Sequence, residues 1–267
     1  MSNPLDAINY PQSAELKAAE IMVDLDGTLV KGDLGESVFF HMLLQKTGDP
    51  YDWFFSREAR KIISAFGGRD QLLETHFTLI KNRQFLEATK YLTKFIAKIP
   101  VEEITRLTWS ILQRNCPPEL IEDPLGDGRG SLKLRYGASL QQELITLVKS
   151  FLEQEARIWI VSASPQPIVE VFGAMMGIPR KQVLAVKMDS RGEQFIRVPY
   201  GQGKVDALAS VGIGTPYIAF GNSLGDLAVL EKAQFPVVME SSYQDLLDIA
   251  HDRGWLLFKP GLGLELT

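Results

Sequence analysis

Two aspartates separated by a single residue follow a short apolar stretch near the start of the chain. Residues 21–29 read Ile-Met-Val-Asp-Leu-Asp-Gly-Thr-Leu. An apolar stretch without alternation is typical of a strand buried on both faces, and side chains two residues apart on such a strand point the same way. The carboxylates of Asp24 and Asp26 can therefore both point to one place just beyond the end of the strand. Two carboxylates that share a point repel each other unless a metal ion or a proton lies between them.

A second apolar stretch, residues 158–161, leads directly into Ser162, Ala163 and Ser164. Ligands bind beyond the carboxyl ends of the strands in a parallel sheet, so these small residues are expected to lie near the two aspartates. Ser164 precedes a proline and suits the cap of a helix that starts there. Because Ser164 fills the cap, Ser162 is the serine expected to contact a phosphate group at this helix N-terminus.

A third apolar stretch, residues 217–220, leads into Gly-Asn-Ser-Leu-Gly-Asp at 221–226. Its last residue, Asp226, has two interpretations. With Ser223 it forms the pattern of a capping box, and acidic side chains are favoured in a first helical turn. The need for a further oxygen ligand beside Asp24 favours metal binding.

Lys204 follows Gly-Gln-Gly and is expected to begin a helix. A cation there faces the positive end of the helix dipole, which is unfavourable unless an anion lies nearby. The two preceding glycines allow a ligand to approach the backbone closely. Because three strand ends already point to an anion, Lys204 is predicted to bind phosphate.

The elements that position these residues alternate in the second half of the chain. From residue 139 onward, apolar stretches alternate with helical periodicity, which implies a mainly parallel sheet with helices on both faces. Residues 34–115 show helical spacing without a convincing strand. Residues 116–138 are rich in Pro, Gly and Asp and are expected to form a return linker. Residues 187–200 are expected to form a short hairpin that turns at 189–192.

The sequence therefore predicts an α/β fold in two parts. A Rossmann-like, mainly parallel core takes residues 1–33 and 134–267, and an all-helical cap domain is inserted over residues 34–133.

These segments, in this order, resemble the four motifs of the haloacid dehalogenase superfamily, in the form found in its phosphatases. The resemblance covers residues 20–33 and 139–240. It implies a Mg²⁺-dependent phosphatase with an aspartyl-phosphate intermediate, in which Asp24 is the nucleophile and Asp26 the general acid and base. The remaining roles that it implies are phosphate binding by Thr28, Ser162, Ala163 and Lys204, and Mg²⁺ binding by Asp24, Asp26, Asn222 and Asp226.

The helical block, which comes directly after the first motif, resembles the cap of the phosphoserine phosphatase-like branch. This resemblance implies a small phosphorylated metabolite as substrate. Asp33 falls near where that branch contacts the substrate's amine. Phosphoserine phosphatases usually carry an aspartate where this chain has Asn222, whose amide oxygen can coordinate Mg²⁺ but brings no charge to it. The block is also longer than their cap and holds several aromatic residues, most of them expected in its core. Because aromatic faces can hold a quaternary ammonium group, phosphocholine is an alternative substrate, and phosphoethanolamine is considered with it.

Two rival functions on the same core stay open. One is a phosphotransferase that passes the phosphoryl group to an acceptor other than water. The other is a non-catalytic binding protein, which the neutral Asn222 makes conceivable. The histidines offer no metal site of their own, because His41, His76 and His251 are scattered along the chain.

Composition argues against several other classes of protein. The 267 residues carry a net charge of −5, which argues against non-specific nucleic-acid binding. No apolar stretch approaches the ~20 residues of a membrane span, and the polar N-terminal segment lacks the core of a signal peptide. The single Cys116 excludes an intramolecular disulfide and fits a reducing compartment. We therefore expect a cytoplasmic enzyme with a small-molecule substrate; its oligomeric state stays open, a homodimer included.

Overall fold

A mainly parallel sheet forms the centre of the computed structural model, which describes residues 16–44, 57–126, 130–261 and 263–266. Its eight strands follow the order β12-β11-β10-β9-β1-β6-β7-β8. The strand that precedes the two aspartates, β1 (Glu20–Val23), lies between β9 (Ile218–Gly221) and β6 (Arg157–Pro165), both parallel to it. The predicted α/β fold with a mainly parallel sheet is confirmed.

The outer strands extend this sheet on both sides. β10 (Phe235–Met239) and β11 (Leu256–Lys259) lie beyond β9, and β7 (Val183–Met188) lies beyond β6. Both edges are antiparallel, formed by β12 (Gly263–Leu266) and β8 (Phe195–Arg197). The hairpin expected over residues 187–200 is confirmed, and Gly192 N–H closes its turn by donating to Asp189 O at 3.0 Å.

Helices cover both faces of the sheet because alternate strand residues point to opposite faces. Ile21 and Val23 of β1 join an apolar cluster with α7 (Gln142–Glu153) and α8 (Gln166–Met175). Met22, which lies between them, joins a second cluster on the other face. That cluster includes α9 (Gln202–Ala209), α10 (Leu227–Leu230) and α11 (Gln244–Asp252). The sheet is the middle of three layers, as its unbroken apolar strands predict.

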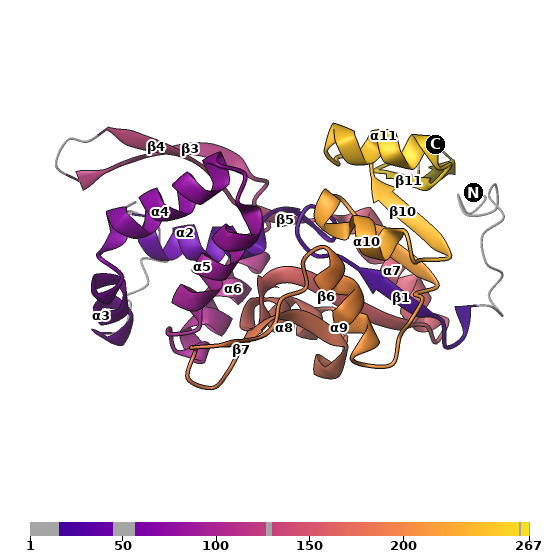
Figure 1. Cartoon of the computed structure of the whole chain (residues 1–267), viewed down its shortest axis with the longest axis horizontal. Coiled ribbons are helices and arrows are strands. Elements are labelled where there is room, and N and C mark those ends of the chain that lie inside the picture. The colour runs from indigo at the N-terminus through magenta and orange to yellow at the C-terminus, as the bar shows by residue number, and fades with distance from the viewer. Residues whose placement is uncertain (1–15, 45–56, 127–129, 262, 267) are drawn as a thin grey trace.

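A block of helices is inserted after β1 and the short strand β2 (Val30–Gly32). It lies to one side of the sheet (Figure 1) and comprises α2 (Leu34–Leu43), α3 (Arg57–Ala65), α4 (Arg69–Lys81), α5 (Phe85–Ile96) and α6 (Val101–Arg114). Buried residues of the block, Phe39 and Phe95 among them, share one apolar cluster with Ile21 of the sheet. The helical insert is confirmed, whereas the predicted boundaries at residues 34 and 133 stay a prediction. Within the described ranges, no helix is long and apolar enough to span a membrane.

Residues 116–138 contain strands where the composition predicts a linker. β3 (Glu119–Pro124) and β4 (Ser131–Tyr136) form an antiparallel pair at the edge of the helical block (Figure 1). The linker prediction is wrong because Pro and Gly cluster at the ends of these strands, while buried and exposed side chains alternate within them. β5 (Ala138–Leu140) pairs with β2, so the two chain crossings between sheet and block run side by side.

Candidate active site

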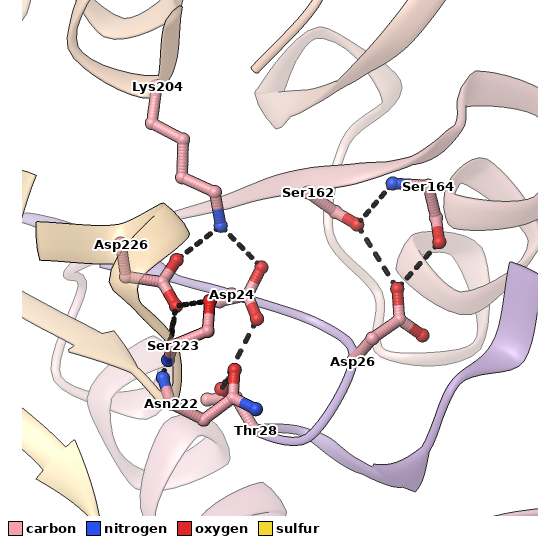
Figure 2. Close-up of polar contacts among 9 residues, drawn as sticks. All are labelled: Asp24, Asp26, Thr28, Ser162, Ser164, Lys204, Asn222, Ser223 and Asp226. Atoms are coloured by element: carbon pink, nitrogen blue, oxygen red, sulfur yellow. Dashed lines mark hydrogen bonds and ion pairs between the residues drawn. The ribbon is translucent and has the colours of Figure 1, made fainter. Parts of the chain in front are cut away.

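Asp24 lies at the carboxyl end of β1, where its backbone N–H donates to Phe220 O of β9 at 3.1 Å. Its side chain is buried, with 6% of its surface exposed. One oxygen, Oδ1, accepts a hydrogen bond from Lys204 Nζ at 2.5 Å. The other, Oδ2, accepts a longer one from Thr28 Oγ1 at 3.3 Å (Figure 2). The backbone of Asp24 is therefore held by the neighbouring strand, and its carboxylate by side chains from α9 and from the loop between β1 and β2.

Lys204 is buried in the first turn of α9, between two carboxylates. Its Nζ donates to Asp24 Oδ1 and to Asp226 Oδ1, each at 2.5 Å. Burial alone would lower the pKa of Lys204, but the two carboxylates outweigh it and raise the pKa above its ordinary value. One cation between two anions leaves an excess negative charge. Burial, together with the charge of Asp226, accordingly raises the pKa of Asp24 to about 7.

Asp226 is fully buried and both of its oxygens have hydrogen-bond donors. Oδ2 accepts bonds from the backbone N–H groups of Asn222 and Ser223, both at 3.0 Å, and from Ser223 Oγ at 3.1 Å. The capping box that the sequence offers as one interpretation of Asp226 is present, at the start of the 3-10 turn Leu224–Asp226. Asp226 thus holds Lys204 and Asn222 in place. Its role as a direct metal ligand stays a prediction.

The side-chain amide of Asn222 faces two oxygen atoms, the carbonyl oxygen of Asp26 and Asp24 Oδ2. With no ion between them, the amide nitrogen donates to these oxygens at 3.0 Å and 3.2 Å; in the opposite orientation, the amide oxygen would complete a cluster of three oxygens. Adjacent ligands of an octahedral Mg²⁺ lie about 2.9 Å apart, so this oxygen cluster fits the ion. The described residues contain no group of three or more His, Cys, Asp or Glu side chains that could hold a metal. A carbonyl and an amide oxygen would therefore complete a site around Asp24.

Gly27 allows the chain to turn tightly enough for this cluster to form. Its φ is +76°, and a Cβ at this position would overlap the side-chain amide of Asn222. We predict that Gly27→Ala destabilises the protein by roughly 1–3 kcal/mol, because it combines backbone strain with displacement of Asn222. Urea unfolding would measure this loss. Gly212→Ala is the matched control, since Gly212 also has a positive φ of +87° but no atoms lie near its missing Cβ. Equal losses in the two variants would contradict a role for crowding at Asn222.

The carboxylate of Asp26 points away from Asn222, toward β6 (Figure 2). Its Oδ1 accepts the backbone N–H of Leu34 at 2.7 Å. Its Oδ2 accepts Ser164 Oγ at 2.6 Å and lies 3.4 Å from Ser162 Oγ. Burial raises the pKa of Asp26, and the bonds from Ser164 and Leu34 offset part of that rise. A carboxyl with a raised pKa suits proton transfer near neutral pH. The two aspartates therefore stand in different chemical environments.

The two serines of β6, Ser162 and Ser164, are two positions apart along the strand and therefore face the same side. The prediction that Ser164 caps the next helix is wrong. β6 continues to Pro165, α8 begins one residue later, and the cap position falls on Pro165, which makes no side-chain cap bond. Ser164 Oγ instead reaches Asp26, while its N–H donates to Ser162 Oγ at 3.0 Å. The spacing of the serines is the sequence signal that could have placed both beside the aspartates.

The other predicted phosphate-binding residues lie around the same point. Thr28 is buried, and its hydroxyl donates to Asp24 Oδ2 at 3.3 Å, with the side-chain amide of Asn222 close by. Ala163 is half-buried between the two serines of β6. Phosphate binding by these residues, and by Ser162 and Lys204, stays a prediction.

Asp33, predicted to contact the substrate, is the N-cap of α2. Its Oδ1 accepts the N–H of Glu36 at 2.6 Å. Burial, followed by the charges of Asp26 and Glu36, raises the pKa of Asp33 well above its ordinary value. Three carboxyl groups therefore gather where the helical block begins. Glu36 was not predicted to belong to the site; its Oε1 contacts Nε2 of the buried His76 at 2.8 Å.

The sequence profile of the family described as haloacid dehalogenase-like hydrolase matches residues 21–231. The chain belongs to this family. The matched region contains both aspartates, the serines of β6, Lys204 and the Asn222–Asp226 segment. A comparison with curated proteins gave no match.

Solved structures share the fold of this haloacid dehalogenase-like hydrolase at low sequence identity. A protein of unknown function from Bordetella pertussis Tohama I has a TM-score of 0.58 at 17% identity, over 91% of this chain and 99% of the other. A phosphoserine phosphohydrolase-like protein from Francisella tularensis subsp. tularensis SCHU S4 has a TM-score of 0.51 at 16% identity, over 86% and 92%. A substrate-bound phosphoserine phosphatase has a TM-score of 0.50 at 14% identity, over 87% and 90%. Such likeness shows the fold, while function depends on the site.

Proposed function

We propose that this hydrolase removes the phosphoryl group from a small phosphomonoester, with Mg²⁺ and through an aspartyl-phosphate on Asp24. The observation that carries the proposal is the separation of the two aspartates. Asp24 faces Lys204 and the oxygen cluster, whereas Asp26 faces the serines of β6 (Figure 2). This separation supports a role for Asp24 in the attack on phosphorus and a role for Asp26 in proton transfer.

In the first step, Asp24 attacks the substrate. Because Asp24 Oδ2 belongs to the oxygen cluster, Oδ1 is the atom that bonds to phosphorus as the phosphorus–oxygen bond of the leaving group breaks. Asp26 gives its proton to the leaving oxygen, which departs as an alcohol. Lys204 and Ser162, with Thr28 and Ala163 beside them, stabilise the charge on the equatorial phosphate oxygens.

In the second step, Asp26 acts as a base. Its carboxylate takes a proton from a water molecule, whose oxygen attacks the phosphorus of the aspartyl-phosphate. The bond to Asp24 Oδ1 breaks, inorganic phosphate leaves, and both aspartates return to their starting states. A magnesium ion held by Asp24, the Asp26 carbonyl and Asn222 would neutralise the phosphate and fix it in line with Asp24.

The acidic N-terminus of α2 favours a substrate whose leaving group carries a cation. Asp33 lies close enough to Asp26 for their charges to interact, and Glu36 acts on both. An amine near the phosphoryl group would compensate these charges. We therefore propose a phosphoserine-like metabolite as the substrate, with phosphocholine or phosphoethanolamine as the alternative.

A screen of phosphomonoesters tests this proposal. Phosphoserine, phosphocholine, phosphoethanolamine, sugar phosphates and nucleotides would be compared with and without Mg²⁺, by release of inorganic phosphate. We expect Mg²⁺-dependent hydrolysis, fastest for a substrate that carries an amine. Turnover of none of these esters would overturn the proposal. Transfer of phosphate to an added alcohol in place of water would identify a phosphotransferase.

Substitution of Asn222 tests the metal site separately. Asn222→Asp adds a charged oxygen to the cluster, so we predict a lower Mg²⁺ concentration for half-maximal activity, whereas Asn222→Ala should raise that concentration. Without Mg²⁺ the aspartate variant should have a lower melting temperature than wild type, because another carboxylate would face Asp24 Oδ2 and the Asp26 carbonyl oxygen. Magnesium titrations of activity and of melting temperature would measure both effects. An unchanged Mg²⁺ requirement in both variants would exclude Asn222 as a ligand.

A further inference from the structure

Asp26 is held from two sides by groups of different chemistry. The backbone N–H of Leu34, the first residue of α2, donates to Oδ1 at 2.7 Å. The hydroxyl of Ser164, near the end of β6, donates to Oδ2 at 2.6 Å. Ser162 Oγ is 3.4 Å from the same oxygen, too far for a strong hydrogen bond. Ser164 therefore makes the short side-chain contact to the carboxyl that is proposed to move the proton.

The two partners of Asp26 differ in what they can accept. A backbone N–H only donates, so it favours Oδ1 as an unprotonated acceptor. A serine hydroxyl both donates and accepts, and it can rotate to follow a proton on Oδ2. We infer that Ser164 is a positioning residue, an inference that rests on the proposed function. Ser164 orients Asp26 so that Oδ2 is the atom that gives the proton to the leaving group.

The absence of a side chain at Gly35 is an independent observation that supports this role, because it leaves room for the hydroxyl of Ser164. Gly35 is the second residue of α2, and glycine within a helix costs up to about 1 kcal/mol relative to alanine. A Cβ at this position would lie 2.6 Å from Ser164 Oγ and 3.2 Å from Asp33 Oδ1. The helix thus lacks a side chain at the point where the serine hydroxyl packs. Ser164 itself is 7% exposed, so little water can replace its hydroxyl.

The inference predicts an effect that depends on the leaving group. A simple alkyl phosphate needs a proton on its departing oxygen, whereas a nitrophenyl phosphate releases a stable anion and needs none. In Ser164→Ala we expect kcat/KM for the alkyl ester to fall on the order of 10²-fold, and that for the nitrophenyl ester to stay within about twofold. The ratio kcat/KM is the relevant quantity because it reports the steps up to departure of the leaving group.

Three further variants separate positioning from other roles. Ser164→Thr keeps the hydroxyl and should recover most of the activity on the alkyl ester. Gly35→Ala should reproduce the selective loss by displacing Ser164 Oγ, and should add little to Ser164→Ala, where that space is vacated. Ser162→Ala, which removes a proposed phosphate ligand, should slow both esters to a similar extent.

The possible outcomes distinguish this inference from the proposed function. Equal losses on the two esters in Ser164→Ala, or no loss on either, would overturn the role of Ser164 while the phosphatase activity of the wild type stands. A wild-type protein that hydrolyses neither ester with Mg²⁺ would overturn both the proposed function and the inference. Selective loss that threonine restores would support the role of Ser164.

Discussion

Asp24→Asn is expected to lower Mg²⁺-dependent phosphatase activity by roughly 10⁴-fold or more, because an amide cannot form the aspartyl-phosphate. The substitution keeps the shape of the side chain and an oxygen that can accept the Lys204 hydrogen bond. Release of inorganic phosphate would measure the loss. Mass spectrometry of acid-quenched wild-type enzyme should place a phosphoryl group on the peptide that contains Asp24. Full activity in the variant would exclude Asp24 as the nucleophile.

The same substitution should not unfold the protein. Asp24 and Asp226 share the single cation of Lys204, so the neutral asparagine removes the excess negative charge from a buried site. Without Mg²⁺ we expect a melting temperature equal to or above that of wild type. With Mg²⁺ the increase in melting temperature should be smaller than in wild type, because one proposed ligand has lost its charge. Asp252→Asn, at a side chain 84% exposed, is the matched control and should change neither activity nor melting temperature.

The grouping of the candidate site residues could be predicted because several of them follow buried apolar stretches. Asp24 comes directly after Val23, which pairs with β6, and Ser162 comes directly after Val161, which pairs with β7. A parallel sheet brings the carboxyl ends of its strands to one edge. Lys204 could be predicted from its position in a first helical turn, where a cation needs an anion nearby. These inferences depend on regular features of α/β folds, so local sequence was sufficient.

Other parts of the site depend on details that local patterns did not resolve. The assignment of Ser164 changed with a one-residue shift in the start of α8, and helix boundaries are uncertain by that amount. The contact of Glu36 with His76 joins α2 to α4, a packing that sequence spacing does not specify. The strand β4 was visible as alternation at Leu132, Leu134 and Tyr136, but nearby Pro and Gly suggested a linker.

The largest loss of stability is expected for Lys204→Met. The methionine fills a similar volume but leaves Asp24 and Asp226 buried without a cation, which should destabilise the protein by about 3–5 kcal/mol. Activity should fall as well, because Lys204 is proposed to bind the phosphate. Urea unfolding without Mg²⁺ would measure the first effect, and kcat/KM for a phosphomonoester the second. A loss of stability below about 1 kcal/mol, typical of exposed ion pairs, would contradict the burial of this pair.

A second variant separates the structural role of Lys204 from its proposed chemical role. In Lys204→Met with Asp226→Asn, one of the two buried anions becomes neutral while Asn222 and Ser223 keep a side-chain oxygen as acceptor. We expect this double variant to recover a substantial part of the lost stability, because the repulsion between the two carboxylates is removed. Its activity should stay low, since no cation has returned to the phosphate site. Recovery of both stability and activity would mean that Lys204 serves only to compensate the two aspartates.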